Sequence, residues 1–76
     1  MTLAEVGVGH EAEIVSYSFG IPPECKSKLL ALGLTRKVIV KVMNESLFGD
    51  QIEIAMRGYN LALRKSEVIF INVKLL

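Results

Sequence analysis

Residues 47–68 alternate between apolar and polar side chains in two runs, which a short glycine-containing break separates. The apolar positions of the two runs are Ile52, Ile54, Met56, Leu61 and Leu63. A period of two residues is typical of a strand with one buried face. The break is Gly58, Tyr59 and Asn60, and both Gly and Asn tolerate a left-handed backbone at low cost. This stretch therefore predicts a β-hairpin, followed by a short polar helical turn at its end.

The rest of the chain predicts more short strands and one clear helix. Alternation of apolar residues indicates strands at residues 11–18, 37–43 and 68–73, and the first residues from Thr2 form a capping-box pattern for a single helical turn. A helix is expected at residues 24–32, with Pro23 suited to its first position and Gly33 to its end. About five short strands with one or two short helices favour a small barrel or sandwich, and a closed barrel leaves no exposed strand edges.

Length and composition indicate one folded domain that spans residues 1–76. The chain is 51% hydrophobic and 22% charged, which supports a packed core and argues against disorder. Its formal net charge is only +1, and the opposite charges interleave, so no strong field exists to attract a nucleic acid or an anionic membrane. A single cysteine, no signal-peptide pattern and no long apolar run lead us to expect a cytoplasmic protein that reaches a membrane only through a partner.

Candidate catalytic and metal-binding residues are few. His10 lies in a Gly-flanked turn and could hold a weak ion with Glu11 or Glu13, but a surface histidine without a metal is the favoured interpretation. Cys25 shares a helix face with Leu29 and Leu32, which favours a buried apolar role over a reactive thiol. We therefore expect no catalytic residue, no tight metal site and no cofactor.

Phe48 and Tyr59 flank the predicted hairpin and raise one alternative function. Aromatic side chains on the rim of a small barrel can stack nucleic-acid bases. The alternative is therefore a small β-barrel nucleic-acid-binding protein, but the balanced charge argues against it, and we expect no nucleic-acid partner.

Three segments in order resemble one family. Residues 28–35 (KLLALGLT) resemble the LLELGLTPG segment of the FeoA family, residues 47–54 (LFGDQIEI) resemble its PLGDPIEI, and residues 57–64 (RGYNLALR) resemble its RGYxLALR. The opening TLAE is also similar to the family's TLSEL. The sequence departs from the family pattern at Arg36 and Lys37, where the family has Pro-Gly. It departs again at Leu47 with the preceding Ser46, where the family has Pro, and at Phe48, where it has Leu.

The resemblance implies an SH3-like five-stranded β-barrel with one or two short helices, and no catalytic residue. It implies a small cytoplasmic accessory protein of bacterial ferrous iron uptake. The expected partner is FeoB, a membrane iron transporter with a cytoplasmic GTP-binding domain. Transition-metal binding is often ascribed to the family, yet this sequence offers no cluster of ligands for it.

The predicted helix also indicates where a partner could bind. At about 100° per residue, Cys25, Leu29 and Leu32 share the core-facing side, whereas Leu30 lies well away from it. Leu34 follows just beyond Gly33, and Phe48 is expected to approach from the next loop. Small apolar patches suit a helix or peptide of a partner, so Leu30, Leu34, Phe48 and Tyr59 are the candidate partner-binding residues.

Overall fold

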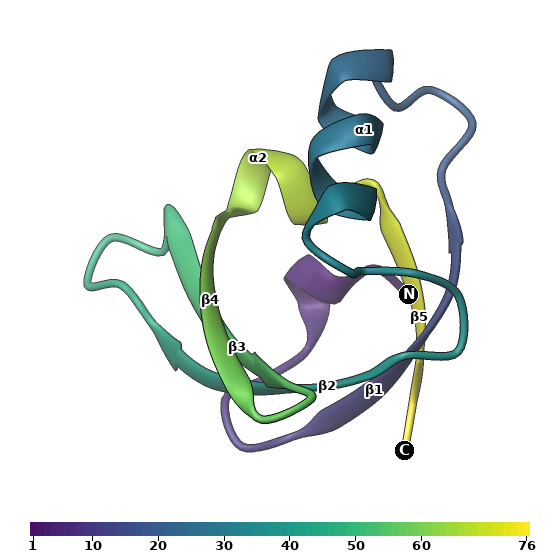
Figure 1. Ribbon diagram of the computed structural model, residues 1–76. Coiled ribbons are helices and arrows are strands. Elements are labelled where there is room, and N and C mark those ends of the chain that lie inside the picture. The colour runs from purple at the N-terminus through teal and green to yellow at the C-terminus, as the bar shows by residue number, and fades with distance from the viewer.

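The computed structural model describes residues 1–76 and contains one antiparallel sheet with short helical elements (Figure 1). None of its helices combines the length and hydrophobicity that crossing a bilayer requires. The elements in chain order are the 3-10 turn η1 (Leu3–Glu5), β1 (Glu11–Tyr17), α1 (Pro23–Ala31), β2 (Ile39–Glu45), β3 (Gln51–Met56), β4 (Tyr59–Arg64), α2 (Lys65–Val68) and β5 (Ile71–Leu75).

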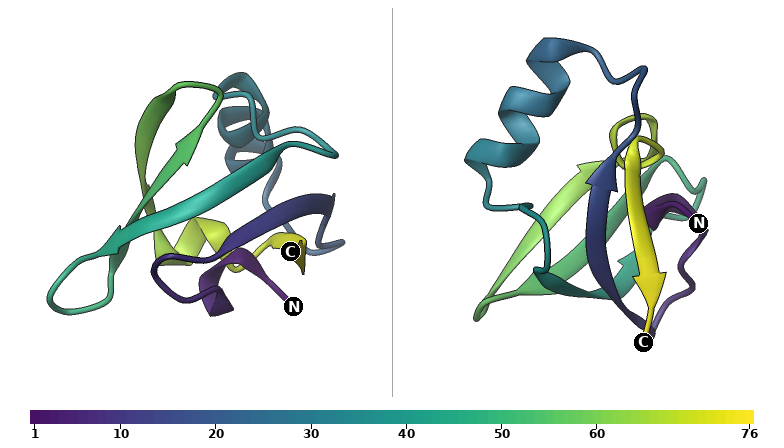
Figure 2. Two further views of the ribbon diagram at one scale, coloured as in Figure 1. Left: turned by 90° about the horizontal axis from the view of Figure 1, so that it is seen from below. Right: turned by 90° about the vertical axis from the view of Figure 1, so that its right-hand side faces the viewer.

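The five strands follow the order β4-β3-β2-β1-β5, and every neighbouring pair is antiparallel. The prediction of a mostly β chain with five strands is thus confirmed. The prediction of a closed barrel is wrong, because β4 and β5 form the two edges of the sheet and do not pair with each other. Figures 1 and 2 show that the sheet instead curves strongly and wraps around the interior, with α1 above its open end.

Two irregularities in the strand pairing accompany this curvature. The register between β1 and β5 shifts between Ile14 and Ser16, and the register between β2 and β3 shifts between Val42 and Asn44. A β-bulge bends its strand and increases the local twist. The two longest strands are therefore bent where they cross the middle of the sheet, which allows one sheet to cover the core from several sides.

The predicted hairpin is β3 and β4, and it is confirmed with a shorter turn than expected. Only Arg57 and Gly58 form the turn, with φ of 47° and 86°, while Tyr59 and Asn60 already belong to β4. Two consecutive residues with positive φ are the signature of a type I′ turn, whose twist matches that of a hairpin. The apolar positions then face each other across the hairpin, because Ile54 pairs with Leu61 and Ile52 with Leu63.

The boundaries of the predicted helix and strands shift by one to three residues. The helix begins at Pro23 as its first position and ends at Ala31, before Gly33 with φ of 94°. The second strand begins two residues later than predicted, because Lys37 has a left-handed φ of 74° that an extended strand does not allow. The last strand begins at Ile71, because Val68 closes α2 instead of opening a strand.

The core consists of sixteen buried residues, all of them apolar, and no polar side chain is buried with them. Every strand contributes to it, as do η1, α1 and α2. The buried residues are Leu3, Val6, Ala12, Ile14, Leu29, Leu34, Val38, Val40, Val42, Ile52, Ile54, Met56, Leu63, Val68, Ile71 and Val73. Since a domain of this size has no disulfide to support it, its stability rests on this one cluster.

The two adjacent leucines of α1 give a direct test of this packing. Leu29 is fully buried, whereas the side chain of Leu30 is 41% exposed. We expect Leu29→Ala to lower the free energy of unfolding by about 2–4 kcal/mol, and Leu30→Ala to change it by less than about 0.5 kcal/mol. Urea unfolding of both variants measures the difference, and equal losses would show that the helix is packed differently.

Candidate functional site

Helix α1 lies across the open end of the sheet and is held there by three polar contacts. The hydroxyl of Tyr17 on β1 donates a hydrogen bond to the backbone carbonyl of Leu34 at 2.6 Å, just after the helix. The hydroxyl of Tyr59 on β4 donates to the carbonyl of Leu32 at 2.8 Å. From the other side, the ammonium group of Lys28 pairs with the carboxylate of Glu67 on α2. The C-terminal half of the helix is therefore fixed to both halves of the curved sheet.

The groups beneath this helix have shifted pKa values. Burial, with a smaller effect from neighbouring Cys25, raises the pKa of Tyr17 to about 12. Burial also raises the pKa of the Cys25 thiol, and the nearby Glu67 carboxylate adds to this effect. The hydrogen bond from Lys28 lowers the pKa of Glu67. A half-buried thiol with a raised pKa is a poor nucleophile at neutral pH, so the structure supports the apolar role expected for Cys25.

The raised pKa of Tyr17 predicts that the protein loses stability at high pH. The pKa of its hydroxyl rises from an ordinary 10.0 to about 12 on folding, so the folded state favours the neutral form. Its contribution to stability is complete below pH 10 and is lost as the pH approaches 12. We expect Tyr17→Phe to lower the free energy of unfolding by about 1 kcal/mol at neutral pH and to flatten its decline above pH 10. Chemical unfolding across this pH range tests both effects, and an unchanged decline in the variant would contradict them.

The structure brings only part of the predicted partner-binding set together. Leu30 is exposed on the last turns of α1, and Tyr59, 45% exposed, contacts the same end of the helix through its hydroxyl. Leu34 is fully buried, so the expectation that it joins an exposed patch is wrong. The chain reverses after Gly33 and directs Leu34 into the core, where its backbone amide bonds to the carbonyl of Leu29 at 3.1 Å.

Phe48 does not approach α1 as predicted. It lies in the loop between β2 and β3, which Figures 1 and 2 place at the far end of the hairpin, away from the helix. Its side chain is 90% exposed, and that of its neighbour Leu47 is 92% exposed. Leu47 was not among the predicted contact residues. The signal for Leu47 was present in the sequence, since it directly precedes Phe48 in a polar turn.

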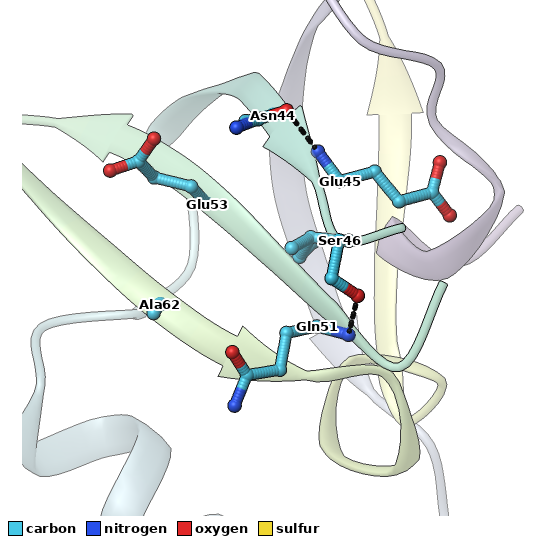
Figure 3. Close-up of a pocket in the computed structure, with 7 residues that line it drawn as sticks. Asn44, Glu45, Ser46, Gln51, Glu53 and Ala62 are labelled. Atoms are coloured by element: carbon cyan, nitrogen blue, oxygen red, sulfur yellow. Dashed lines mark hydrogen bonds between the residues drawn. The ribbon is translucent and has the colours of Figure 1, made fainter. Parts of the chain in front are cut away.

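This loop is internally hydrogen-bonded although its apolar side chains face the solvent. The hydroxyl of Ser46 accepts hydrogen bonds from the backbone amides of Asp50 and Gln51, both at 3.1 Å, and interacts with the Asp50 carboxylate. Figure 3 shows the hydrogen bond that the Gln51 amide donates to the Ser46 hydroxyl. It lies beside a shallow depression of about 260 Å³, which Asn44, Glu53 and Ala62 also line. Ser46, which directly precedes the LFGD segment, thus orders the turn by hydrogen bonds.

A second shallow depression of about 340 Å³ lies at the other end of the hairpin. Lys41, Arg57 and Tyr59 line it together with Ile39 and Met56. Both depressions are open and shallow, unlike the enclosed clefts in which small molecules are usually held. Neither depression therefore encloses a small molecule.

The potential metal ligands stay dispersed. The structure contains no group of three or more His, Cys, Asp or Glu side chains that could hold a metal ion. His10 is exposed in the connection between η1 and β1, and Cys25 lies on α1 against the core.

The sequence of the chain matches one known protein family along almost its whole length. The sequence model of the FeoA domain matches residues 1–75. The chain belongs to the FeoA family. No curated protein matches its sequence significantly.

Solved structures agree with this assignment. The FeoA protein of Chlorobium tepidum is 34% identical with a TM-score of 0.89, and the match covers 100% of this chain and 70% of that one. The FeoA-like protein of Clostridium acetobutylicum is 28% identical with a TM-score of 0.90, covering 100% of this chain and 86% of that one. The FeoA of Stenotrophomonas maltophilia, solved with zinc and described as an SH3 domain protein, is 22% identical with a TM-score of 0.83, covering 97% and 89%. The last likeness supports an SH3-like fold for this chain.

The dispersed ligands predict weak metal binding by this FeoA chain. Tight sites for zinc or iron need several clustered His, Cys or carboxylate ligands, and none are gathered here. We expect anaerobic calorimetry with ferrous iron and with zinc to show no stoichiometric binding in the micromolar range or tighter. Stoichiometric binding that His10→Ala abolishes would contradict this and locate the site in the turn before β1.

Proposed function

We propose that this chain is a cytoplasmic accessory protein of ferrous iron uptake, which acts by binding the GTP-binding part of a FeoB-type membrane transporter. The observation that carries the proposal is the FeoA domain match over residues 1–75. The Stenotrophomonas maltophilia relative is described as possibly a ferrous iron transport activating factor, in line with this role. Neither the residues nor the family points to catalysis, so the role proposed is that of an interaction module.

The C-terminal half of α1 is the proposed contact for the transporter. Leu30 exposes an apolar side chain on a helix that Tyr17, Tyr59 and Lys28 fix in place. A surface that is already ordered loses little conformational entropy when a partner binds. Such a rigid, partly apolar helix suits the contact better than the surrounding charged loops.

Replacing Leu30 tests this contact. We expect Leu30→Arg to fold like the wild type, because the side chain points away from the core, and to weaken transporter binding by about tenfold or more, since a charge then enters an apolar contact. The measurement is a pull-down of the detergent-solubilised FeoB-type transporter of the same organism, beside a thermal melt of the variant.

Val8→Arg is the matched control for this experiment. Val8 is an exposed aliphatic residue, at 53%, in the connection between η1 and β1. Figure 1 shows that this connection lies at the opposite end of the molecule from α1. Equal binding by wild type and Leu30→Arg would move the contact away from α1, and no binding by the wild type would refute the proposed partner.

A further inference from the structure

The two edges of the sheet differ in how their backbone groups are covered. On β5, the amide of Val73 donates to the carbonyl of Met1 at 2.9 Å, and Thr2 forms an isolated bridge with Asn72. The N-terminal segment thus protects that edge. No segment pairs with the outer side of β4, which is the other edge strand in Figure 2.

The register of the hairpin identifies which groups of β4 face outward. The two-residue turn makes Met56 and Tyr59 the hydrogen-bonded pair that closes it, and such pairs alternate along an antiparallel ladder. The amide of Lys65 donates to the carbonyl of Asp50 at 2.9 Å, which continues this alternation beyond the strand. The backbone amides and carbonyls of Asn60 and Ala62 therefore point away from β3.

One outward amide of this strand is already bonded. The amide of Arg64 donates to the carboxylate of Glu67 at 3.1 Å, so the end of the strand is capped. On the side away from β3, no hydrogen bond joins the amide of Asn60 or that of Ala62 to another group. Both residues are exposed, and the side chain of Ala62 is only a methyl group, which leaves room beside the edge. Figure 3 shows Ala62 near Gln51 and Glu53.

The strand also lacks the usual protection of an edge. Natural edge strands are blocked by proline, by charged side chains and above all lysine, by a bulge or by a covering segment. The six residues of β4 (YNLALR) contain neither proline nor lysine, their one charged residue is Arg64 at the end, and their pairing with β3 runs without a register shift. An open and regular edge of this kind is a template for an added strand.

We propose that the free edge of β4 binds an extended segment of a partner protein, which adds a sixth strand through the backbone groups of Asn60 and Ala62. Arg57 lies in the turn before β4 and Arg64 is its last residue, and neither belongs to an ion pair, whereas Glu53 lies opposite Ala62 in the middle. The segment therefore carries acidic residues near its ends and a small neutral residue at its centre. Its inward side chains are apolar, because they lie beside the partly exposed Tyr59 and Leu61.

A second copy of this chain fits the edge less well. Antiparallel pairing of β4 with itself about Ala62 would place Arg64 opposite Asn60 of the copy. That arrangement leaves the Arg64 side chain of each copy without an acidic neighbour on the added strand. The charges of the strand thus favour a different chain as the occupant, whether or not that chain is the iron transporter.

A peptide selection tests the proposal. A phage library of random peptides, long enough to pair with the six residues of β4, is selected on the immobilised full chain, and the enriched peptides are synthesised. We expect alternating apolar residues with acidic ends. We also expect bound peptide to slow hydrogen exchange at the amides of Asn60 and Ala62 in nuclear magnetic resonance spectra.

Ala62→Pro and Ala62→Ser form the matched pair of variants. Proline removes the outward amide, which an edge strand tolerates because that group has no internal partner. We expect Ala62→Pro to weaken peptide binding about tenfold or more, and Ala62→Ser, which keeps the amide, to bind like the wild type. If Ala62→Pro does not fold, the exchange rates of the two wild-type amides decide.

Three results would overturn the proposal. The first is that no peptide is enriched, and the second is that enriched peptides leave both amides exchanging as in the free protein. The third is a dimer in sedimentation experiments that Ala62→Pro dissociates, because a second copy would then occupy the edge.

Discussion

The bending of a single sheet around one apolar core is the constraint on which the rest of this structure depends. The chain is short, so the surface that it can bury is limited, and it has neither a disulfide nor a buried polar network. The irregular pairing at Ile14 and at Val42 bends β1 and β2, so that one sheet reaches around the core. A sheet bent in this way, but not closed, leaves an open end and two edges, and the remaining elements are placed where these must be covered.

Each short element covers a different part of this opening. The N-terminal segment pairs with β5, η1 adds Leu3 to the core, and α1 inserts Leu29 and spans the open end. Because α1 buries only one residue completely, its position depends on hydrogen bonds from two tyrosines, one on β1 and one on β4. The apolar positions of the helix that are not needed for the core, with Leu30 foremost, are therefore exposed in a fixed orientation.

Features set by neighbouring residues were predictable from the sequence, whereas features set by distant parts of the chain were not. The alternation of Ile52 and Ile54 predicted the hairpin, and the helical spacing correctly separated buried Leu29 from exposed Leu30. The sequence did not reveal that β4 and β5 stay apart, because closure depends on the bending of the whole sheet. It also misplaced Leu34 and Phe48, because their surroundings depend on how the chain turns after Gly33 and on the length of the hairpin.

Tyr59 connects the two surface regions that we propose as partner contacts. As the first residue of β4 it lies at one end of the open edge, and through its hydroxyl it fixes the carbonyl of Leu32 at the end of α1. Gly33 is packed against it, since a Cβ at that position would approach the Tyr59 hydroxyl to 3.3 Å. A partner segment added along β4 would therefore run toward the helix that presents Leu30. In the two proposed contacts the strand edge would supply hydrogen bonds and the helix apolar area, and the bond from Tyr59 to Leu32 would make them one continuous surface built from elements that the core requires for other reasons.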